Sequence, residues 1–268
     1  MPCGCGKTGI IRRKYMNQIR ESISIDSIDM DKCYYNPGCA LIEYKPETVN
    51  SIWQMLKNNF GYVKLHSTCC RYDPKLPDGS VIIADCAGCD RRFRSLYEGI
   101  ETITLWEVLD SIDNLPLPDY KGAKMSVHDS CGYRHKPQIH RAIRSLLSKM
   151  NIQIVEAEYH GENSVCCGDN FYGYVDNDRV EKRIQERANQ FPCEDVVVYC
   201  IGCLRGFSAK GITPRHLVDL LLNLETAPIL ETLDEYHAHA RFTENMLTEE
   251  LVSADMCNAC AGYLDKTF

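Results

Sequence analysis

The chain has 268 residues, of which 44% are hydrophobic and 25% charged, a composition typical of a folded protein with room for two domains. Its formal charge of -7 argues against general affinity for nucleic acid, which requires a basic face. No apolar run approaches the ~18 residues of a membrane span, and the N-terminus lacks the apolar core of a signal peptide, so we expect a cytoplasmic protein. In a reducing cytoplasm, 16 cysteines predict metal ligation and not a disulfide framework.

Residues 1–32 read as an N-terminal arm. The last part of this arm, from Ser22 to Asp29, alternates apolar and polar residues, as a half-buried strand does. The polar members of the stretch suit a surface arm equally well, so the sequence leaves both structures open.

Residues 33–115 are expected to fold as a first α/β unit. A strand at 32–35 leads through the turn Asn36-Pro37-Gly38 to Cys39, and Pro46 opens a helix with one apolar face. The remaining elements alternate in the same way: strands at 62–65, 81–85 and 102–104, and a helix at 105–112.

A linker at 115–119, interrupted by two prolines, separates this unit from a second one at 120–225. The second unit repeats the order of elements, with strands expected at 124–127, 152–155 and 196–199, a helix from Pro137, a polar helix at 179–190 and a helix that starts at Thr213-Pro214. Residues 226–268 are interpreted as a helical C-terminal tail, with its helix running from about Asp234 past Glu249 and a CxxC near the end.

The second unit carries five cysteines in the order single, adjacent pair and CxxC: Cys131, Cys166, Cys167, Cys200 and Cys203. Adjacent cysteines make a poor structural disulfide, because their sulfurs close a small ring far from relaxed geometry. Thiolate ligands select zinc or iron–sulfur clusters, and a CxxC on a turn presents two sulfurs on one side of the backbone. Five thiolates are more than a tetrahedral zinc or an ordinary four-iron cube takes from protein, which favours an unusual iron–sulfur cluster.

The first unit repeats the same order of cysteines, as Cys39, Cys69, Cys70, Cys86 and Cys89. A repeat about a hundred residues long indicates two similar domains and not a solenoid. All ten cysteines fall at or near expected strand ends, where the sites of α/β sheets gather. The spacer between pair and CxxC is about half as long in the first unit, which leaves open a zinc site made by Cys69, Cys86, Cys89 and one other sulfur.

Four motifs of the second unit together resemble a known domain family: His128-Asp129-Ser130-Cys131-Gly132, Cys166-Cys167-Gly168, Cys200-Ile201-Gly202-Cys203 and the stretch 216–221. They are similar to the CCG cysteine-rich domain, which occurs twice in the catalytic B subunit of heterodisulfide reductase. The domain also occurs in the iron–sulfur subunits of glycolate, lactate and glycerol-3-phosphate dehydrogenases. The resemblance covers roughly residues 33–225, and the first unit departs from it where Arg71 replaces the glycine that usually follows the pair.

This resemblance implies an α/β fold of two pseudo-repeated, Rossmann-like domains with cysteines at the strand ends. It further implies one or two 4Fe-4S clusters of a non-cubane type, each held by five cysteines, beside a cavity where a disulfide is split into two thiols. The chain lacks a ferredoxin-type cysteine run, so electrons are expected from a ferredoxin-like or flavoprotein partner subunit.

The expected function is therefore that of an iron–sulfur disulfide reductase subunit that resembles the catalytic component of heterodisulfide reductase and acts on a small-molecule disulfide or thiol in an anaerobic cytoplasm. Two alternatives remain open. One is an electron-transfer iron–sulfur subunit of a flavoprotein dehydrogenase that performs no bond chemistry. The other is a structural protein stapled by zinc.

Cysteines at the two ends offer four more thiolates: Cys3, Cys5, Cys257 and Cys260. Four sulfurs suit an additional zinc or 4Fe-4S site, and a structural thiolate site can offset the entropy of joining distant segments. Idle thiols at frayed ends, or two sites completed by another subunit, are the alternatives.

Other residues near the motifs have both chemical and structural interpretations. His128 and His135 are candidate proton donors beside a cluster, although a histidine after a strand often has a structural hydrogen bond instead. Asp129 could accept a backbone N–H at a turn. Cys33 and Cys193 lie outside both sets and are expected to serve packing.

Overall fold

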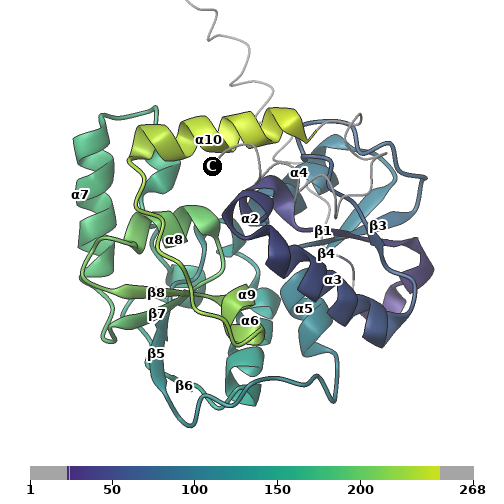
Figure 1. Cartoon of the computed structure of the whole chain (residues 1–268), viewed down its shortest axis with the longest axis horizontal. Helices are drawn as coiled ribbons and strands as arrows, with labels where there is room; N and C mark the ends of the chain where they lie inside the picture. The colour runs from purple at the N-terminus through teal and green to yellow at the C-terminus, as the bar shows by residue number, and fades with distance from the viewer. Residues whose placement is uncertain (1–22, 24, 248–268) are drawn as a thin grey trace, which may run out of the picture.

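The computed structural model describes residue 23 and residues 25–247, which form two α/β units side by side (Figure 1). Each unit is built on a four-stranded parallel sheet, and the two sheets have equivalent strand orders, β2-β1-β3-β4 and β6-β5-β7-β8. The duplication expected from the cysteine order is thus present in the topology. The α/β fold class and its two Rossmann-like units are confirmed.

The elements of the first unit follow the alternation expected from the sequence. Its strands are β1 (Cys33–Asn36), β2 (Lys64–Leu65), β3 (Ser80–Ala84) and β4 (Ile100–Thr104). Its helices are α2 (Gly38–Tyr44), α3 (Pro46–Phe60), α4 (Ala87–Leu96) and α5 (Leu105–Asp110). Pro46 is the first residue of α3, where a missing N–H costs little, and Thr104 and Glu107 form a capping box at the start of α5.

The second unit repeats this alternation and adds one long helix. Its strands are β5 (Lys124–Val127), β6 (Gln153–Ile154), β7 (Asp195–Val198) and β8 (Thr213–His216). Its helices are α6 (Pro137–Lys149), α7 (Asn177–Ala188), α8 (Ile201–Phe207) and α9 (Leu217–Leu221). Helix α7 lies between the cysteine pair and the CxxC, and the shorter spacer of the first unit, residues 71–79, contains no helix. The difference in spacer length is therefore one helix.

Two expectations about local structure are wrong. The stretch from Ser22 to Asp29 is not a strand where the structure describes it, because a short 3-10 helix occupies Ile25–Ser27. Thr213-Pro214 does not start a helix but lies in β8, and the helix begins only at Leu217. Proline is tolerated there because β8 is an edge strand, so its missing N–H removes no hydrogen bond from the interior of the sheet.

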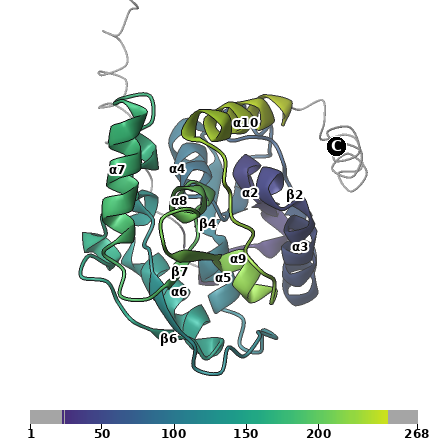
Figure 2. The ribbon, with the colours of Figure 1, turned by 60° about the vertical axis from the view of Figure 1, so that its left-hand side comes forward.

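The expected tail helix is α10 (Leu233–Met246), which begins with a capping box formed by Thr232 and Glu235. Its expected continuation past Glu249 lies outside the described residues. Helix α10 runs over both units and packs against α2 of the first one (Figures 1 and 2). None of the helices in the described ranges combines the length and apolarity needed to cross a membrane.

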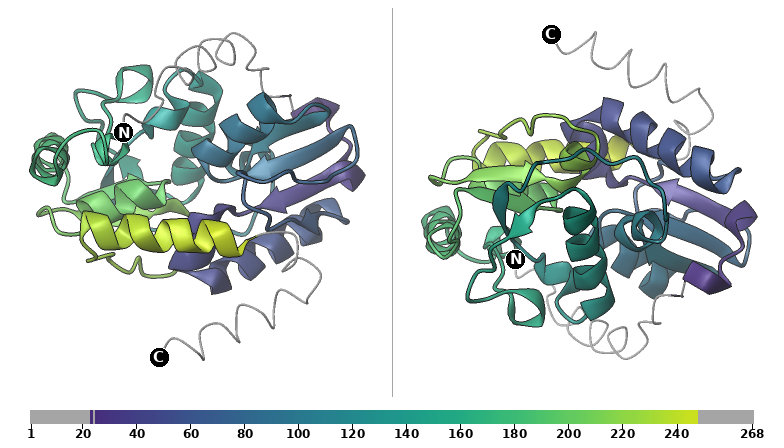
Figure 3. Two further views of the ribbon diagram at one scale, coloured as in Figure 1. Left: turned by 90° about the horizontal axis from the view of Figure 1, so that it is seen from above. Right: turned by 90° about the horizontal axis from the view of Figure 1, so that it is seen from below.

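A single large core spans both units. Helices α5 and α6 pack against each other across the boundary, as the views from above and below show (Figure 3). Buried ion pairs cross it as well: Lys45 Nζ lies 2.8 Å from Asp219 Oδ1, and Lys136 Nζ lies 3.0 Å from Asp90 Oδ2. The shared core fixes the orientation of the two carboxyl sheet edges toward each other.

Candidate metal and redox site

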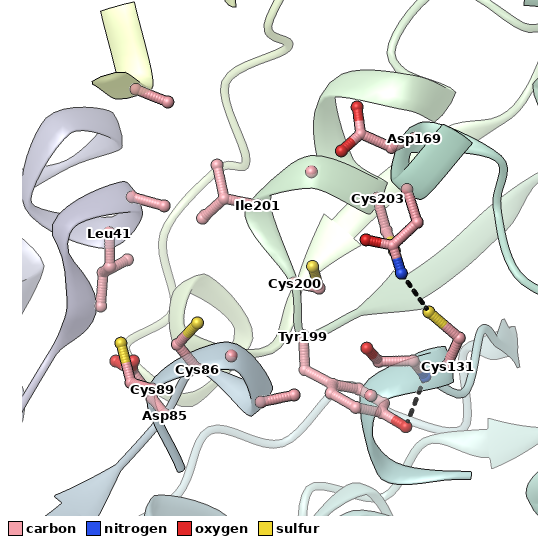
Figure 4. Close-up of a pocket in the computed structure, with 18 of the residues that line it drawn as sticks. Leu41, Asp85, Cys86, Cys89, Cys131, Asp169, Tyr199, Cys200, Ile201 and Cys203 are labelled. Atoms are coloured by element: carbon pink, nitrogen blue, oxygen red, sulfur yellow. Dashed lines mark hydrogen bonds between the residues drawn. The ribbon is translucent and has the colours of Figure 1, made fainter. Parts of the chain in front are cut away.

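A cavity of 330 Å³ lies between the two units, where the segments that follow β1, β3, β5 and β7 meet. Nine of the ten cysteines of the two sets line it, all except Cys69. Figure 4 shows Cys86 and Cys89 on one side of the cavity and Cys131, Cys200 and Cys203 on the other. Sulfurs that are far apart in the sequence are thus brought to a single space by the ends of parallel strands.

The five cysteines of the second set form one continuous chain of sulfur contacts. Cys131 hydrogen-bonds Cys166, which in turn hydrogen-bonds its neighbour Cys167. The Sγ of Cys203 lies 3.3 Å from the Sγ of Cys167 and also contacts Cys200. The order of contacts is therefore single cysteine, pair, and then the second and first cysteines of the CxxC.

The first set has the same order of contacts despite its shorter spacer. Cys39 hydrogen-bonds Cys69, and Cys69 hydrogen-bonds Cys70. Cys70 then contacts Cys89, which contacts Cys86. The absence of a helix such as α7 has not turned Cys86 and Cys89 away from the other three sulfurs.

Helix starts place the CxxC sulfurs in both units. Cys86 is the N-cap of α4 and Cys200 the N-cap of α8, so the second cysteine of each motif lies in the first helical turn. Backbone N–H groups in a first helical turn have no intrahelical partner and favour negative charge nearby. Each CxxC is therefore placed where thiolates are stabilised.

Glycine is required at two places beside the cysteines. Gly38, with φ of 72°, precedes Cys39, and a Cβ there would lie 3.1 Å from the Cβ of Cys86. Gly168, with φ of 121°, follows the pair, and a Cβ there would lie 3.0 Å from Ile184 on α7. Arg71, at the corresponding place in the first unit, has no positive φ and is exposed, because no helix packs over it. The unusual arginine after the first pair thus follows from the missing helix.

The thiol contacts separate the pKa values of neighbouring cysteines. A hydrogen bond from Cys39 lowers the pKa of Cys69 to about 3, and one from Cys131 lowers the pKa of Cys166 to about 2. The contact with Cys69 raises the pKa of Cys70 to about 12. Each set can therefore hold a thiolate only by keeping protons on its neighbours. A bound metal replaces those protons, which makes such crowding favourable when all five thiols are ionised.

His128 is buried against the second set and does not line the cavity. Its Nδ1 accepts a hydrogen bond from Arg187 Nε at 3.4 Å, and its Nε2 has no hydrogen-bond partner in the described part of the chain. A ring nitrogen of His128 and the sulfurs of Cys167 and Cys203 lie within 4.8 Å of one another. Burial lowers the pKa of His128 to about 3, so its imidazole is neutral at neutral pH. A neutral ring can donate Nε2–H toward these sulfurs, and this geometry differs from a proton donor facing substrate.

The other candidate residues have varied positions. Asp129 accepts hydrogen bonds from Gly161 N and from the guanidinium of Arg144, a stronger form of the turn contact expected for it. His135 is exposed and lines a different hollow. Cys33 is buried in β1, where burial raises the pKa of its thiol to about 12.

Two further cysteine groups lie apart from the cavity. Cys193 is half-buried in the loop before β7 and belongs to neither set. The expected additional site at the chain ends involves Cys3, Cys5, Cys257 and Cys260, which lie outside the described residues.

Several cavity residues gave no signal of their own in the sequence. Tyr199 donates to Asp129 Oδ1 and accepts from Ser130 N at 2.8 Å, which anchors the loop that carries Cys131 (Figure 4). Asp85 lines the opposite side and accepts a hydrogen bond from Tyr35, and burial raises its pKa. Both Tyr199 and Asp85 immediately precede a CxxC, and that adjacency is the signal that could have found them.

The fold and the cavity define an α/β protein with duplicated units that carry thiolate ligand sets at their strand ends. Residues 125–208, from β5 through α8, match the family CCG, the cysteine-rich domain, and this segment contains all five cysteines of the second set. No curated protein matches the chain. The matched domain and the grouped cysteines indicate a metal-binding protein, and its soft donor set suits zinc or iron–sulfur clusters.

Proposed function

We propose that this protein is an iron–sulfur oxidoreductase subunit that reduces a small disulfide in the cavity between its two cysteine sets. The observation that carries the proposal is that both sets have the same five-membered order of sulfur contacts and share one cavity. A structural zinc uses four sulfurs and needs no cavity beside it. Duplicated sets of five thiols around a shared space fit redox chemistry better.

The residues present fit 4Fe-4S clusters. Thiolates would come from the two sets already described, and the helix starts at Cys86 and Cys200 favour their negative charge. When bound, such clusters supply electrons one at a time. The residues of the chain position the two sets on opposite sides of the cavity and limit the access of water from the side covered by α10.

The reaction can be balanced without any group inside the cavity supplying electrons permanently. One disulfide takes up two electrons and two protons, its S–S bond breaks, and two thiols form. The electrons come from an external one-electron donor, for which we propose a ferredoxin-like or flavoprotein partner, and the protons come from solvent. A two-electron reaction fed by one-electron steps gives a physical reason for duplicated sets.

Iron and acid-labile sulfide in anaerobically purified protein test the first part of the proposal. Cys167→Ser should remove most of the iron of the second set, because an alcohol is a hard and weakly acidic ligand compared with a thiol. Cys193→Ser is the matched control, since Cys193 belongs to neither set, and it should leave the iron unchanged. Zinc without sulfide in the wild type would establish the structural alternative instead.

Turnover tests the second part. Reduced viologen should drive the conversion of a small disulfide to two thiols, measured by thiol release, and Cys167→Ser should lose this activity. Clusters that are reduced by the viologen without any thiol release would identify an electron-transfer subunit and contradict the reductase proposal.

A further inference from the structure

Two arginines form part of the first unit's wall of the cavity. Arg91 and Arg92 lie on α4, one helical turn after Gly88 and Cys89, and both line the cavity. Their neighbour Arg94 points elsewhere, since its guanidinium is buried in an ion pair with Asp90 at 2.7 Å. In the part of the chain that the structure describes, no carboxylate forms an ion pair with Arg91 or Arg92.

The corresponding positions of the second unit are neutralised. Arg205 follows Cys203 by two residues, as Arg91 follows Cys89, but Arg205 is buried and pairs with Glu181 on α7 at 2.8 Å. Gly206, three residues after Cys203, packs under Ile184 of the same helix. Helix α7 is the element that the first unit lacks, so its absence leaves cationic side chains on one wall only.

The acidic residues of the cavity already have partners. Asp85 accepts a hydrogen bond from Tyr35 at 3.2 Å. Asp169 lies 3.2 Å from Nε2 of His237, which comes from α10. Neither of these acidic side chains forms an ion pair with the two arginines, so the arginines can take an anion from solution.

We propose that Arg91 and Arg92 form a subsite for an anionic group, a carboxylate in the simplest case, on the small molecule that enters this cavity. A guanidinium fork matches carboxylate geometry and binds it through charge-assisted hydrogen bonds. A cleft with one sign of charge also concentrates ions of the opposite sign. The inference rests on the proposed function for the identity of the ligand as a disulfide, and it selects acidic disulfides over neutral or cationic ones.

Binding measured without an electron donor tests the subsite separately from catalysis. Calorimetric titration of the anaerobic, cluster-loaded protein with dithiodiglycolate, bis-hydroxyethyl disulfide and cystamine compares a dianion, a neutral molecule and a dication with the same S–S bond. Dithiodiglycolate should bind most tightly. Replacing both residues, Arg91→Gln with Arg92→Gln, should raise its Kd about tenfold, or about 1.4 kcal/mol, and change the Kd of the neutral disulfide less than about twofold.

Controls separate this role from two others. Arg179→Gln, at an exposed arginine of α7, should leave all three Kd values unchanged. Unchanged iron content and absorption spectrum of the double variant show that it is folded and loaded. If the arginines only balance the charge of the cysteine sets, the double variant loses neutral and anionic binding alike, and the subsite is overturned. Equal binding of all three disulfides to the wild type overturns it too.

The outcomes also separate the subsite from the proposed function. Viologen-driven reduction of the neutral disulfide, with no effect of ligand charge on binding, leaves the reductase standing and removes the subsite. Arginine-dependent binding of the dianion, with no disulfide reduced, leaves the subsite standing and removes the reductase.

Discussion

Gly132 and Ala87 touch across the boundary between the two units. A Cβ built on Gly132 would lie 2.5 Å from the Cβ of Ala87, closer than real side chains approach. Gly132 directly follows Cys131, and Ala87 lies between Cys86 and Cys89. The ligand loop of one unit therefore packs on the CxxC turn of the other, and the separation of the two cysteine sets depends on this contact.

Gly132→Ala should lower the stability of the protein and its metal content together. The new methyl group must push the two loops apart, and overpacking of this kind costs about 1–3 kcal/mol. Thermal unfolding and iron content, measured anaerobically, check the effect. Gly206→Ala is the control, because a Cβ there meets Ile184 at 3.5 Å, an ordinary contact distance. Equal behaviour of the two variants would contradict a tight contact at Gly132.

Lys45→Met should destabilise the packing between the units. The carboxylate of Asp219 is 1% exposed, and Lys45 Nζ, 2.8 Å away, is its cationic partner. Removing one partner of a buried pair leaves an uncompensated charge, at a cost of about 3 kcal/mol. Denaturant unfolding gives the measurement.

The matched control for this pair is Lys32→Met. Lys32 lies 3.7 Å from Asp29, and both side chains are more than half exposed, with 60% and 57% of their surface accessible. An exposed pair contributes between about 0 and 1 kcal/mol. A loss at Lys45 as small as that at Lys32 would mean that Asp219 does not depend on the ion pair.

His66 should make the protein less stable in mild acid. Burial lowers the pKa of its imidazole from 6.5 to about 4, while the unfolded chain takes up the proton near the ordinary value. The unfolded state therefore binds more protons below pH 6.5, and stability is lost as the pH falls from there toward 4. The full loss is about 3 kcal/mol, from the free energy equivalent of one pKa unit.

The variant His66→Phe isolates this effect, because His66 contacts the ring of Phe93 and its Nε2 has no hydrogen-bond partner among the described residues. The melting temperature of the variant should fall less between pH 7 and pH 5 than that of the wild type. His239→Gln, at an exposed histidine, should retain the wild-type slope. Parallel slopes for wild type and His66→Phe would exclude His66 as the source.

Most of the fold could be predicted because its signals are local. The apolar strand at 196–199 and the proline that opens the helix at Pro46 each depend on neighbouring residues alone. The errors arise where tertiary context decides. Pro214 reads as a helix start, but a place at the edge of the sheet makes it a strand residue. The helix after Cys86 gives a weak signal because its apolar residues are few.

The candidate site shows the same division. Cysteine order alone identifies which sulfurs belong to each set, since ligand type and spacing are written in the sequence. The partner of Arg205 could not be predicted, because Glu181 lies on another helix 24 residues away. That Arg91 and Arg92 line the cavity likewise follows only from the way the two units pack.

Each set is expected to hold its own iron, which can be tested one set at a time. Cys70→Ser should remove about half of the iron and acid-labile sulfide, since the alcohol replaces one soft ligand of the first set, and combining it with Cys167→Ser should remove nearly all. Cys33→Ser is the matched control, because Cys33 is buried in β1 outside both sets and should leave the iron unchanged. Crystallographic anomalous scattering at the iron and zinc edges identifies the metal at each set. Zinc held by four sulfurs at Cys69, Cys70, Cys86 and Cys89 would show that only the second unit carries a cluster, and the argument from two facing clusters would then be wrong.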